Sequence, residues 1–128
     1  MPDSMYPSPT RELARMRRDL APESLAAFHA FSQKVFEPGA LDARTKQIIA
    51  VAAAHVTQCP YCIRGHTKAA LREGASEAEL MEAIWVAAEM RAGASYAHSL
   101  LALAEMEPRE TTEEGERDVG HPAEAGRS

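Results

Sequence analysis

The spacing of apolar residues along the chain predicts α-helices and no β-strand. Between residues 22 and 35, large apolar side chains recur every three or four positions, at Leu25, Phe28, Phe31 and Val35. This spacing places them on one side of a helix. Pro22 suits the first turn of that helix, and the Pro38-Gly39 pair suits its end.

Two further helices are predicted on either side of a short connection near Gln58. Asp42 suits the N-cap of a helix that runs to about Thr57, and the pattern places Ile48, Ile49, Ala52 and Val56 on its buried side. Pro60 suits the start of the next helix, which would stop at Gly74. Because so few residues separate the two, we expect an antiparallel helical hairpin with its apex near Gln58.

The C-terminal half of the chain predicts two more helices. Ser76 and Glu79 have the spacing of a capping box, which would open a fourth helix with Leu80, Ile84 and Ala87 facing inward. Gly93 is expected to break it, and a fifth helix with Tyr96, Leu100 and Leu103 would follow until Pro108. The predicted fold class is therefore all-α.

This pattern divides the chain into three parts. Residues 1–21 are expected to form an N-terminal arm with a short helix, residues 22–107 a helical domain, and residues 108–128 a disordered acidic tail. Alanine is abundant and aromatic residues make up only 5% of the chain, which favours close-packed helices. These helices carry more apolar surface than one copy can bury, so we expect a homo-oligomer.

Charge and hydropathy exclude several classes of partner. The net charge is −5 and no basic stretch is present, which argues against nucleic acid and anionic membranes as partners. The longest apolar run, residues 48–54, is far too short to span a bilayer. The N-terminus has no apolar stretch typical of a secretion signal, so a cytoplasmic location is predicted.

The candidate chemistry lies in the run Cys59-Pro60-Tyr61-Cys62-Ile63-Arg64-Gly65-His66, which contains both cysteines of the chain. Two thiols at this spacing can close a disulfide across one helical turn, and His66 follows Cys62 one turn further along the same face. The first turn of a helix favours thiolate over thiol because its N–H groups are unsatisfied and the dipole is positive there. We therefore predict dithiol redox chemistry without a cofactor or a metal.

The expected hairpin brings other polar residues toward this run. Gln47 lies before the apex of the hairpin and His66 lies after it. Side-chain reach can bridge much of the difference between their distances from the apex, so the two could meet across the hairpin. His55, nearer the apex, could face the cysteines and is the weakest candidate of the site. A zinc site of Cys59, Cys62, His66 and His55 is an alternative, although three of these ligands would share one short helix. The CPYC motif is also typical of glutaredoxins, but that fold requires strands that this sequence does not predict.

The segment from Leu41 to about Met106 resembles the AhpD-like alkylhydroperoxidases of the carboxymuconolactone decarboxylase superfamily. The residues that carry the resemblance are Leu41-Asp42-Ala43-Arg44-Thr45-Lys46, Cys59-x-x-Cys62-x-x-x-His66, Ala69-Ala70-Leu71, Gly74-Ala75-Ser76, Ala83-Ile84 and Met90-Arg91-Ala92-Gly93. The resemblance implies an all-helical homotrimer or homohexamer with the cysteine pair at the start of a core helix. It implies a peroxidase that reduces hydroperoxides and is recharged by a dithiol, such as a lipoylated or thioredoxin-like protein.

The same resemblance assigns roles within the motif. Cys62 would be the peroxidatic cysteine, Cys59 the resolving and exchanging one, and His66 part of the proton relay. The helix dipole, in contrast, favours Cys59 as the thiolate, so the assignment stays open. Members of the AhpD branch usually have a glutamate where this chain has Gln47, and an amide cannot accept a proton. Either the proton relay is shorter and weaker in this chain, or His55 substitutes for the missing base.

The sequence thus predicts a thiol-dependent peroxidase or disulfide reductase with Cys59, Cys62, His66, Gln47 and His55 as site residues. Two alternatives stay open. One is a redox-sensing oligomer in which the disulfide only switches conformation. The other is a decarboxylase-like lyase in which the thiols are incidental.

Overall fold

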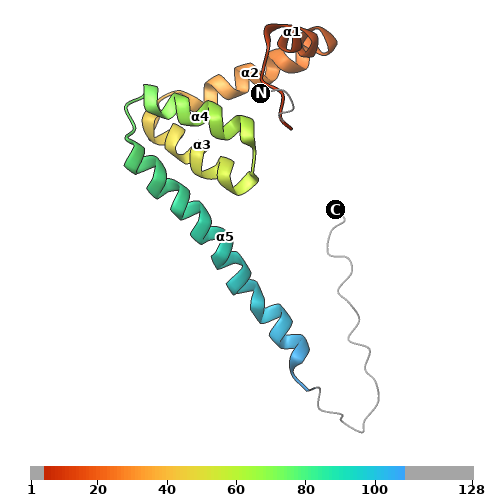
Figure 1. Ribbon diagram of the computed structural model, residues 1–128, viewed down its shortest axis with the longest axis vertical. Coiled ribbons are helices and arrows are strands. Elements are labelled where there is room, and N and C mark those ends of the chain that lie inside the picture. Colours follow the sequence, from red (N-terminus) through yellow and green to blue (C-terminus); the bar gives the residue numbers. More distant parts are fainter. Residues whose placement is uncertain (1–4, 109–128) are drawn as a thin grey trace, which may run out of the picture.

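The computed structural model describes residues 5–108, and this part of the chain forms α-helices and no strand. This confirms the predicted all-α class. The helices are α1 (Arg11–Leu20), α2 (Pro22–Phe36), α3 (Ala43–Thr57), α4 (Pro60–Arg72) and α5 (Glu77–Met106), as Figure 1 shows. The acidic tail predicted for residues 108–128 lies, apart from Pro108, outside the described residues.

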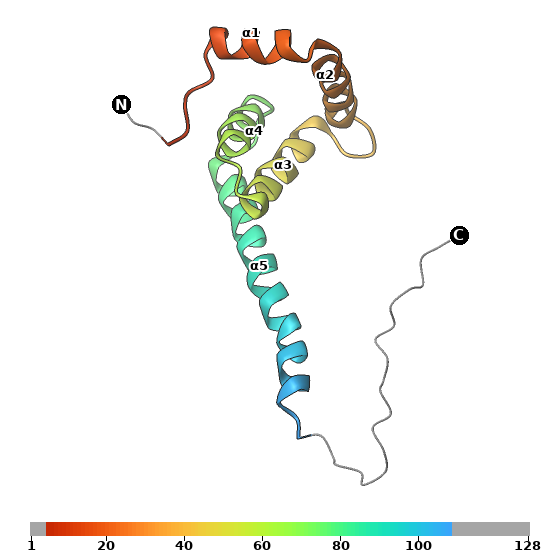
Figure 2. The same cartoon turned by 90° about the vertical axis from the view of Figure 1, so that its right-hand side faces the viewer.

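The packed centre of the chain is built from α3, α4 and the first half of α5 (Figure 2). Val51 of α3 and Ala70 of α4 are fully buried, and Leu80 of α5 is only 5% exposed. Ile48 and Ile84 pack against this cluster from its edge. The predicted inward positions of Leu80, Ile84 and Ala87 are confirmed.

The prediction for the buried side of α3 is wrong in part. Ile48 packs on the core as expected, but Ile49 and Val56 are about half exposed. The side of α3 that meets α4 and α5 instead carries Val51 and Ala54. Small side chains on this side let the helices approach closely, which a count of large apolar residues does not detect.

The short connection between α3 and α4 has the expected form of a hairpin. Gln58 ends α3 with a φ of 54°, in the left-handed region, and its backbone N–H donates to the carbonyl of Ala54. The backbone N–H of Cys59 donates to the same carbonyl at 3.2 Å. The chain therefore reverses direction over two residues, Gln58 and Cys59, and Cys59 directly precedes α4.

Helix α5 differs from the prediction at Gly93. The capping box of Ser76 and Glu79 is present as predicted, but the helix runs without interruption through Gly93 to Met106. The expected break is wrong because an isolated glycine costs a helix only about 1 kcal/mol. The neighbouring Arg91, Ala92 and Ala94 are good helix formers and offset that cost.

Two charged side chains of α3, those of Arg44 and Lys46, connect this helix to its neighbours. Arg44 near the start of α3 pairs with Glu79, whose other carboxylate oxygen accepts from the N–H of Ser76 at 3.0 Å. Lys46 of α3 donates to the carbonyl of Val35 at 2.8 Å and to that of Glu37 at 2.5 Å, at the end of α2. These contacts fix the start of α3 against both α2 and α5.

The remaining helices cover little of the core. Helix α1 has no buried residue and packs against α2, while the second half of α5 extends away from the other helices (Figures 1 and 2). Within residues 5–108, no helix combines the length and the hydropathy needed to cross a membrane.

Candidate functional site

The two cysteines lie at the start of α4 and form a disulfide. Cys59 is the N-cap residue, Pro60 opens the helix, and Cys62 follows in the first turn. Their Cα atoms are 5.2 Å apart, within the range that a disulfide requires. Both residues are half-buried, so the pair sits at the rim of the packed centre where a small reagent can reach it.

The sulfur of Cys59 takes the place that a serine or aspartate oxygen occupies at most helix starts. The backbone N–H of Cys62 points to this sulfur at 3.2 Å. Once the disulfide is reduced, the same N–H and the positive end of α4 stabilise a negative charge on Cys59. The geometry therefore supports the dipole argument for a Cys59 thiolate.

His66 and Gln47 meet across the hairpin, as the sequence analysis allowed. Nδ1 of His66 lies 2.8 Å from Oε1 of Gln47, and both side chains are half-buried. An amide oxygen can only accept a hydrogen bond, so Nδ1 donates and carries the proton. Nε2 of the neutral ring then keeps its lone pair and can accept a proton from a nearby group.

One contact of this site was missed by the sequence analysis. The ring of Phe36, in the last turn of α2, stacks on the imidazole of His66 with ring centroids 5.1 Å apart. Lys46 holds the end of α2 in place through the carbonyls of Val35 and Glu37. The only signal in the sequence is an aromatic residue just before Glu37-Pro38-Gly39, where the chain must turn toward α3.

His55 is placed differently from the other candidates. Its Nδ1 lies 2.7 Å from the carbonyl oxygen of Val51, one turn earlier in its own helix. A carbonyl only accepts, so this nitrogen donates, and the contact orients the ring along α3. No hydrogen bond in the described part of the chain joins His55 to a cysteine.

The alternative of a zinc site finds no support in the arrangement of side chains. Within residues 5–108, no three His, Cys, Asp or Glu side chains are grouped so that they could hold a metal ion. Arg64, which could have added positive potential, is exposed to solvent. The side chains that the structure brings together are thus Cys59 with Cys62, and His66 with Gln47 and Phe36.

A family model described as carboxymuconolactone decarboxylase family matches residues 22–105 of the chain. Solved structures agree with this match. A protein from Methanobacterium thermoautotrophicum is 36% identical with a TM-score of 0.63, over 66% of this chain and 94% of its own. A carboxymuconolactone decarboxylase family protein from Legionella pneumophila is 37% identical with a TM-score of 0.57, over 62% of this chain and 70% of its own.

Curated sequences include a nearer relative. A Paracoccus denitrificans protein named "Uncharacterized protein 4 in cox locus" is 70% identical over 78 residues, which are 61% of this chain and 70% of that protein. An uncharacterized protein of Cupriavidus necator is 36% identical over 83 residues, or 63% of this chain and 74% of that protein.

Proposed function

The chain belongs to the carboxymuconolactone decarboxylase family, and from its cysteine pair we propose that it is a thiol-dependent peroxidase recharged by an external dithiol. The observation that carries the proposal is the disulfide at the start of α4 with a hydrogen-bonded histidine on the same helix. Two cysteines on one helical turn stay close together whether they are oxidised to a disulfide or reduced to thiols. Such a pair can be oxidised and reduced repeatedly without rebuilding the fold.

In the first half of the cycle, the thiol of Cys62 is oxidised by a hydroperoxide. Nε2 of His66, one turn further along α4, takes the thiol proton. The thiolate attacks the terminal oxygen, the O–O bond breaks, and the alkoxide takes the proton back to leave as an alcohol. Cys62 is left as a sulfenic acid.

In the second half, Cys59 resolves the sulfenic acid. The N–H of Cys62 and the dipole of α4 favour its thiolate, which is the reactive form for this step. The Cys59 thiolate attacks the sulfur of Cys62, the S–O bond breaks, and water leaves after taking up a proton. A dithiol then donates two electrons and two protons, becomes a disulfide itself, and restores both cysteines.

Gln47 gives His66 a different role from the one a carboxylate would give it. The amide fixes the tautomer of His66 but carries no charge to stabilise an imidazolium. His66 therefore acts alone as the proton carrier, and Gln47 is a positioning residue. His55, which is bonded to its own helix, is not needed in this scheme.

We also propose that the chain works as a homo-oligomer, a trimer or a hexamer. The second half of α5 carries Tyr96, Leu100 and Leu103 on one side of the helix, all more than half exposed. Exposed apolar stripes of this size are typical of subunit interfaces.

Turnover of an organic hydroperoxide tests the proposal. We expect cumene hydroperoxide to be reduced over many cycles when dihydrolipoamide is supplied, and Cys62→Ser to abolish the reaction. His66→Ala should lower the rate at least tenfold, as expected for loss of a general base. His55→Ala, which removes a half-buried histidine of the same hairpin, is the matched control and should change it little.

The same assay separates the alternatives. A single oxidation that the dithiol reverses without turnover would indicate a redox sensor. Activity that survives in the Cys59→Ser, Cys62→Ser double variant would mean that the thiols are incidental, as in a lyase.

A further inference from the structure

One of the two residues between the cysteines connects the site to the N-terminal arm. Tyr61 follows Pro60 in the first turn of α4, and its hydroxyl donates to the carbonyl oxygen of Pro7 at 2.9 Å. Its ring also meets the ring of Tyr6 edge to face, with centroids 6.1 Å apart. Residues more than fifty positions apart in sequence are therefore joined on the same helical turn as the disulfide.

The arm reaches this turn by folding back over the hairpin. It leaves the start of α1, where Thr10 caps the helix, and runs toward the start of α4 (Figures 1 and 2). Tyr6 and Tyr61 are each only about 40% exposed, although Tyr6 belongs to an irregular segment near the chain terminus. The two rings meet at the turn that carries Cys59 and Cys62.

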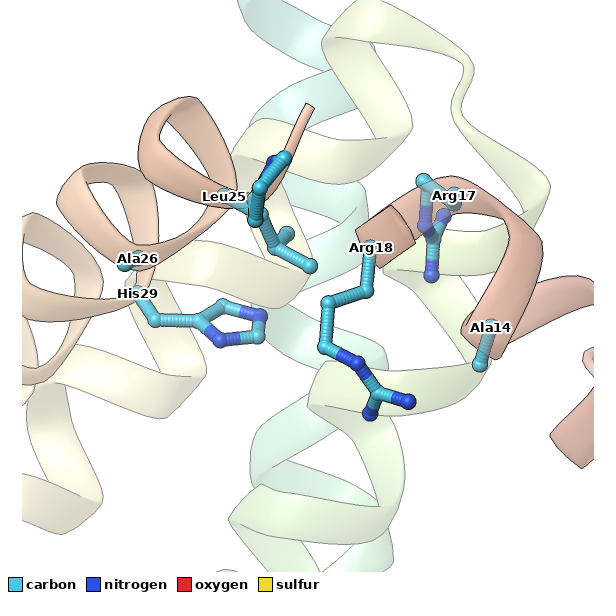
Figure 3. A pocket seen from close by; sticks show the side chains of 7 residues that line it. Ala14, Arg17, Arg18, Leu25, Ala26 and His29 are labelled. Atoms are coloured by element: carbon cyan, nitrogen blue, oxygen red, sulfur yellow. The ribbon is translucent and has the colours of Figure 1, made fainter. Parts of the chain in front are cut away.

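The other attachment of this segment is loosely packed. Helix α1 leans on α2 at an elbow that contains a pocket of about 320 Å³, lined among others by Arg18, Leu25 and His29 (Figure 3). No residue of α1 or α2 is buried. Because none of residues 5–20 is buried, this segment can open locally at a small energetic cost.

From this arrangement we propose that the Tyr6–Pro7–Tyr61 cluster is a size filter over the disulfide, with Tyr61 as the residue that closes it. A disulfide is reduced by a thiolate that approaches a sulfur atom from outside, so the space around the first turn of α4 decides which dithiol reacts. A small dithiol reaches the disulfide while the arm stays closed. A macromolecular dithiol has to displace it, so arm opening sets the rate for a protein reductant.

The physiological meaning of this filter rests on the proposed dithiol cycle, but its test requires only the disulfide itself. The oxidised full chain is mixed with dithiothreitol or with reduced thioredoxin, and loss of the Cys59–Cys62 disulfide is followed in time. Three variants are compared with wild type: Tyr61→Phe, which removes the hydroxyl; Tyr6→Ala, which removes the opposing ring; and Phe31→Ala, which removes an exposed aromatic ring of α2, as the control.

We expect the ratio of the thioredoxin rate to the dithiothreitol rate to rise about fivefold in Tyr61→Phe, because one lost hydrogen bond of about 1 kcal/mol corresponds to that factor, and at least as much in Tyr6→Ala. Phe31→Ala should leave the ratio unchanged. An unchanged ratio in all variants would overturn the filter, and so would an equal rise for both reductants. A lower thioredoxin rate would also overturn it, since the cluster would then be a docking site. None of these outcomes depends on whether a peroxide is turned over.

Discussion

The two halves of α5 have similar apolar content but opposite surroundings. In the first half, Leu80 and Ala87 are 5% and 3% exposed against the hairpin of α3 and α4. In the second half, Tyr96 and Leu100 are 82% and 70% exposed. The difference shows that the packing of one copy is concentrated where the first half of α5 meets α3 and the end of α4. The rest of the apolar surface is available for contact with other copies.

The largest effect should come from the packed half of α5. Leu80→Ala removes a buried side chain and leaves a cavity, so we expect the free energy of unfolding to fall by about 2–4 kcal/mol. Leu100→Ala makes the same chemical change at an exposed position and should cost much less in dilute solution. Urea unfolding at low protein concentration measures both. Equal losses in the two variants would contradict the comparison.

Substitutions in the exposed second half of α5 should change self-association rather than the stability of the fold. Leu100→Glu places a charge in the apolar stripe and should weaken self-association at least tenfold, as seen by sedimentation equilibrium. His98→Glu is the control, because residues two positions away point to the far side of the helix. A wild-type chain that sediments as a compact monomer at micromolar concentration would refute the proposed oligomer.

Within the packed centre, substitutions of Gln47 on α3 test how His66 is held in position. Gln47→Leu removes the hydrogen bond that fixes the tautomer of His66 and should slow oxidation by peroxide about tenfold. Gln47→Glu restores an acceptor and adds a charge that stabilises the protonated ring, so its rate should reach a maximum at higher pH. Stopped-flow rates across neutral pH distinguish the two variants. Identical pH profiles for wild type and Gln47→Glu would exclude a positioning role.

A substitution in the turn between α3 and α4 should have a smaller effect on the free energy of unfolding, and it should raise that free energy. Gln58 has a positive φ, which costs a residue with a side chain about 1 kcal/mol relative to glycine. Gln58→Gly should therefore raise the free energy of unfolding by about that amount. Gly74→Ala is the paired test, because Gly74 has a φ of 91° and a side chain there is strained. We expect it to destabilise the chain, and a stabilised variant would contradict the backbone argument.

The smallest expected effect concerns pH. Hydrogen bonds from the side chain and the backbone of Thr45 lower the pKa of Asp42, the N-cap of α3, below its ordinary value of 3.8. A carboxyl with a lowered pKa contributes stability above its unfolded pKa, and this contribution is lost as the pH falls through the folded value. Asp42→Asn should lower the urea midpoint at neutral pH and lose that difference in acid. A difference between Asp42→Asn and wild type that persists unchanged in acid would contradict this account.

Much of the packed centre of α3, α4 and the first half of α5 could be predicted from local sequence signals. Asp42, Pro60 and the Ser76–Glu79 capping box each act within one turn, so they fix where helices begin without reference to the rest of the fold. The short connection at Gln58 then dictated an antiparallel hairpin. The contact of Gln47 with His66 followed from that hairpin and from residue counting.

The features that were wrong or missed depend on contacts between distant segments. Gly93 could not end α5, since one weak position is overcome by its neighbours. Phe36 reaches His66 only because α2 is held at its end by Lys46, and Tyr61 meets Pro7 only because the arm folds back. No periodicity in the chain encodes these pairings.

The most direct test of the proposed chemistry is one turnover of the reduced protein with an organic hydroperoxide. Stopped flow would follow peroxide loss, and mass spectrometry would follow formation of the Cys59–Cys62 disulfide. We predict one peroxide consumed and one disulfide formed per chain, at a rate well above that of free cysteine at the same pH. Oxidation no faster than that of free cysteine would contradict a peroxidase role for this site.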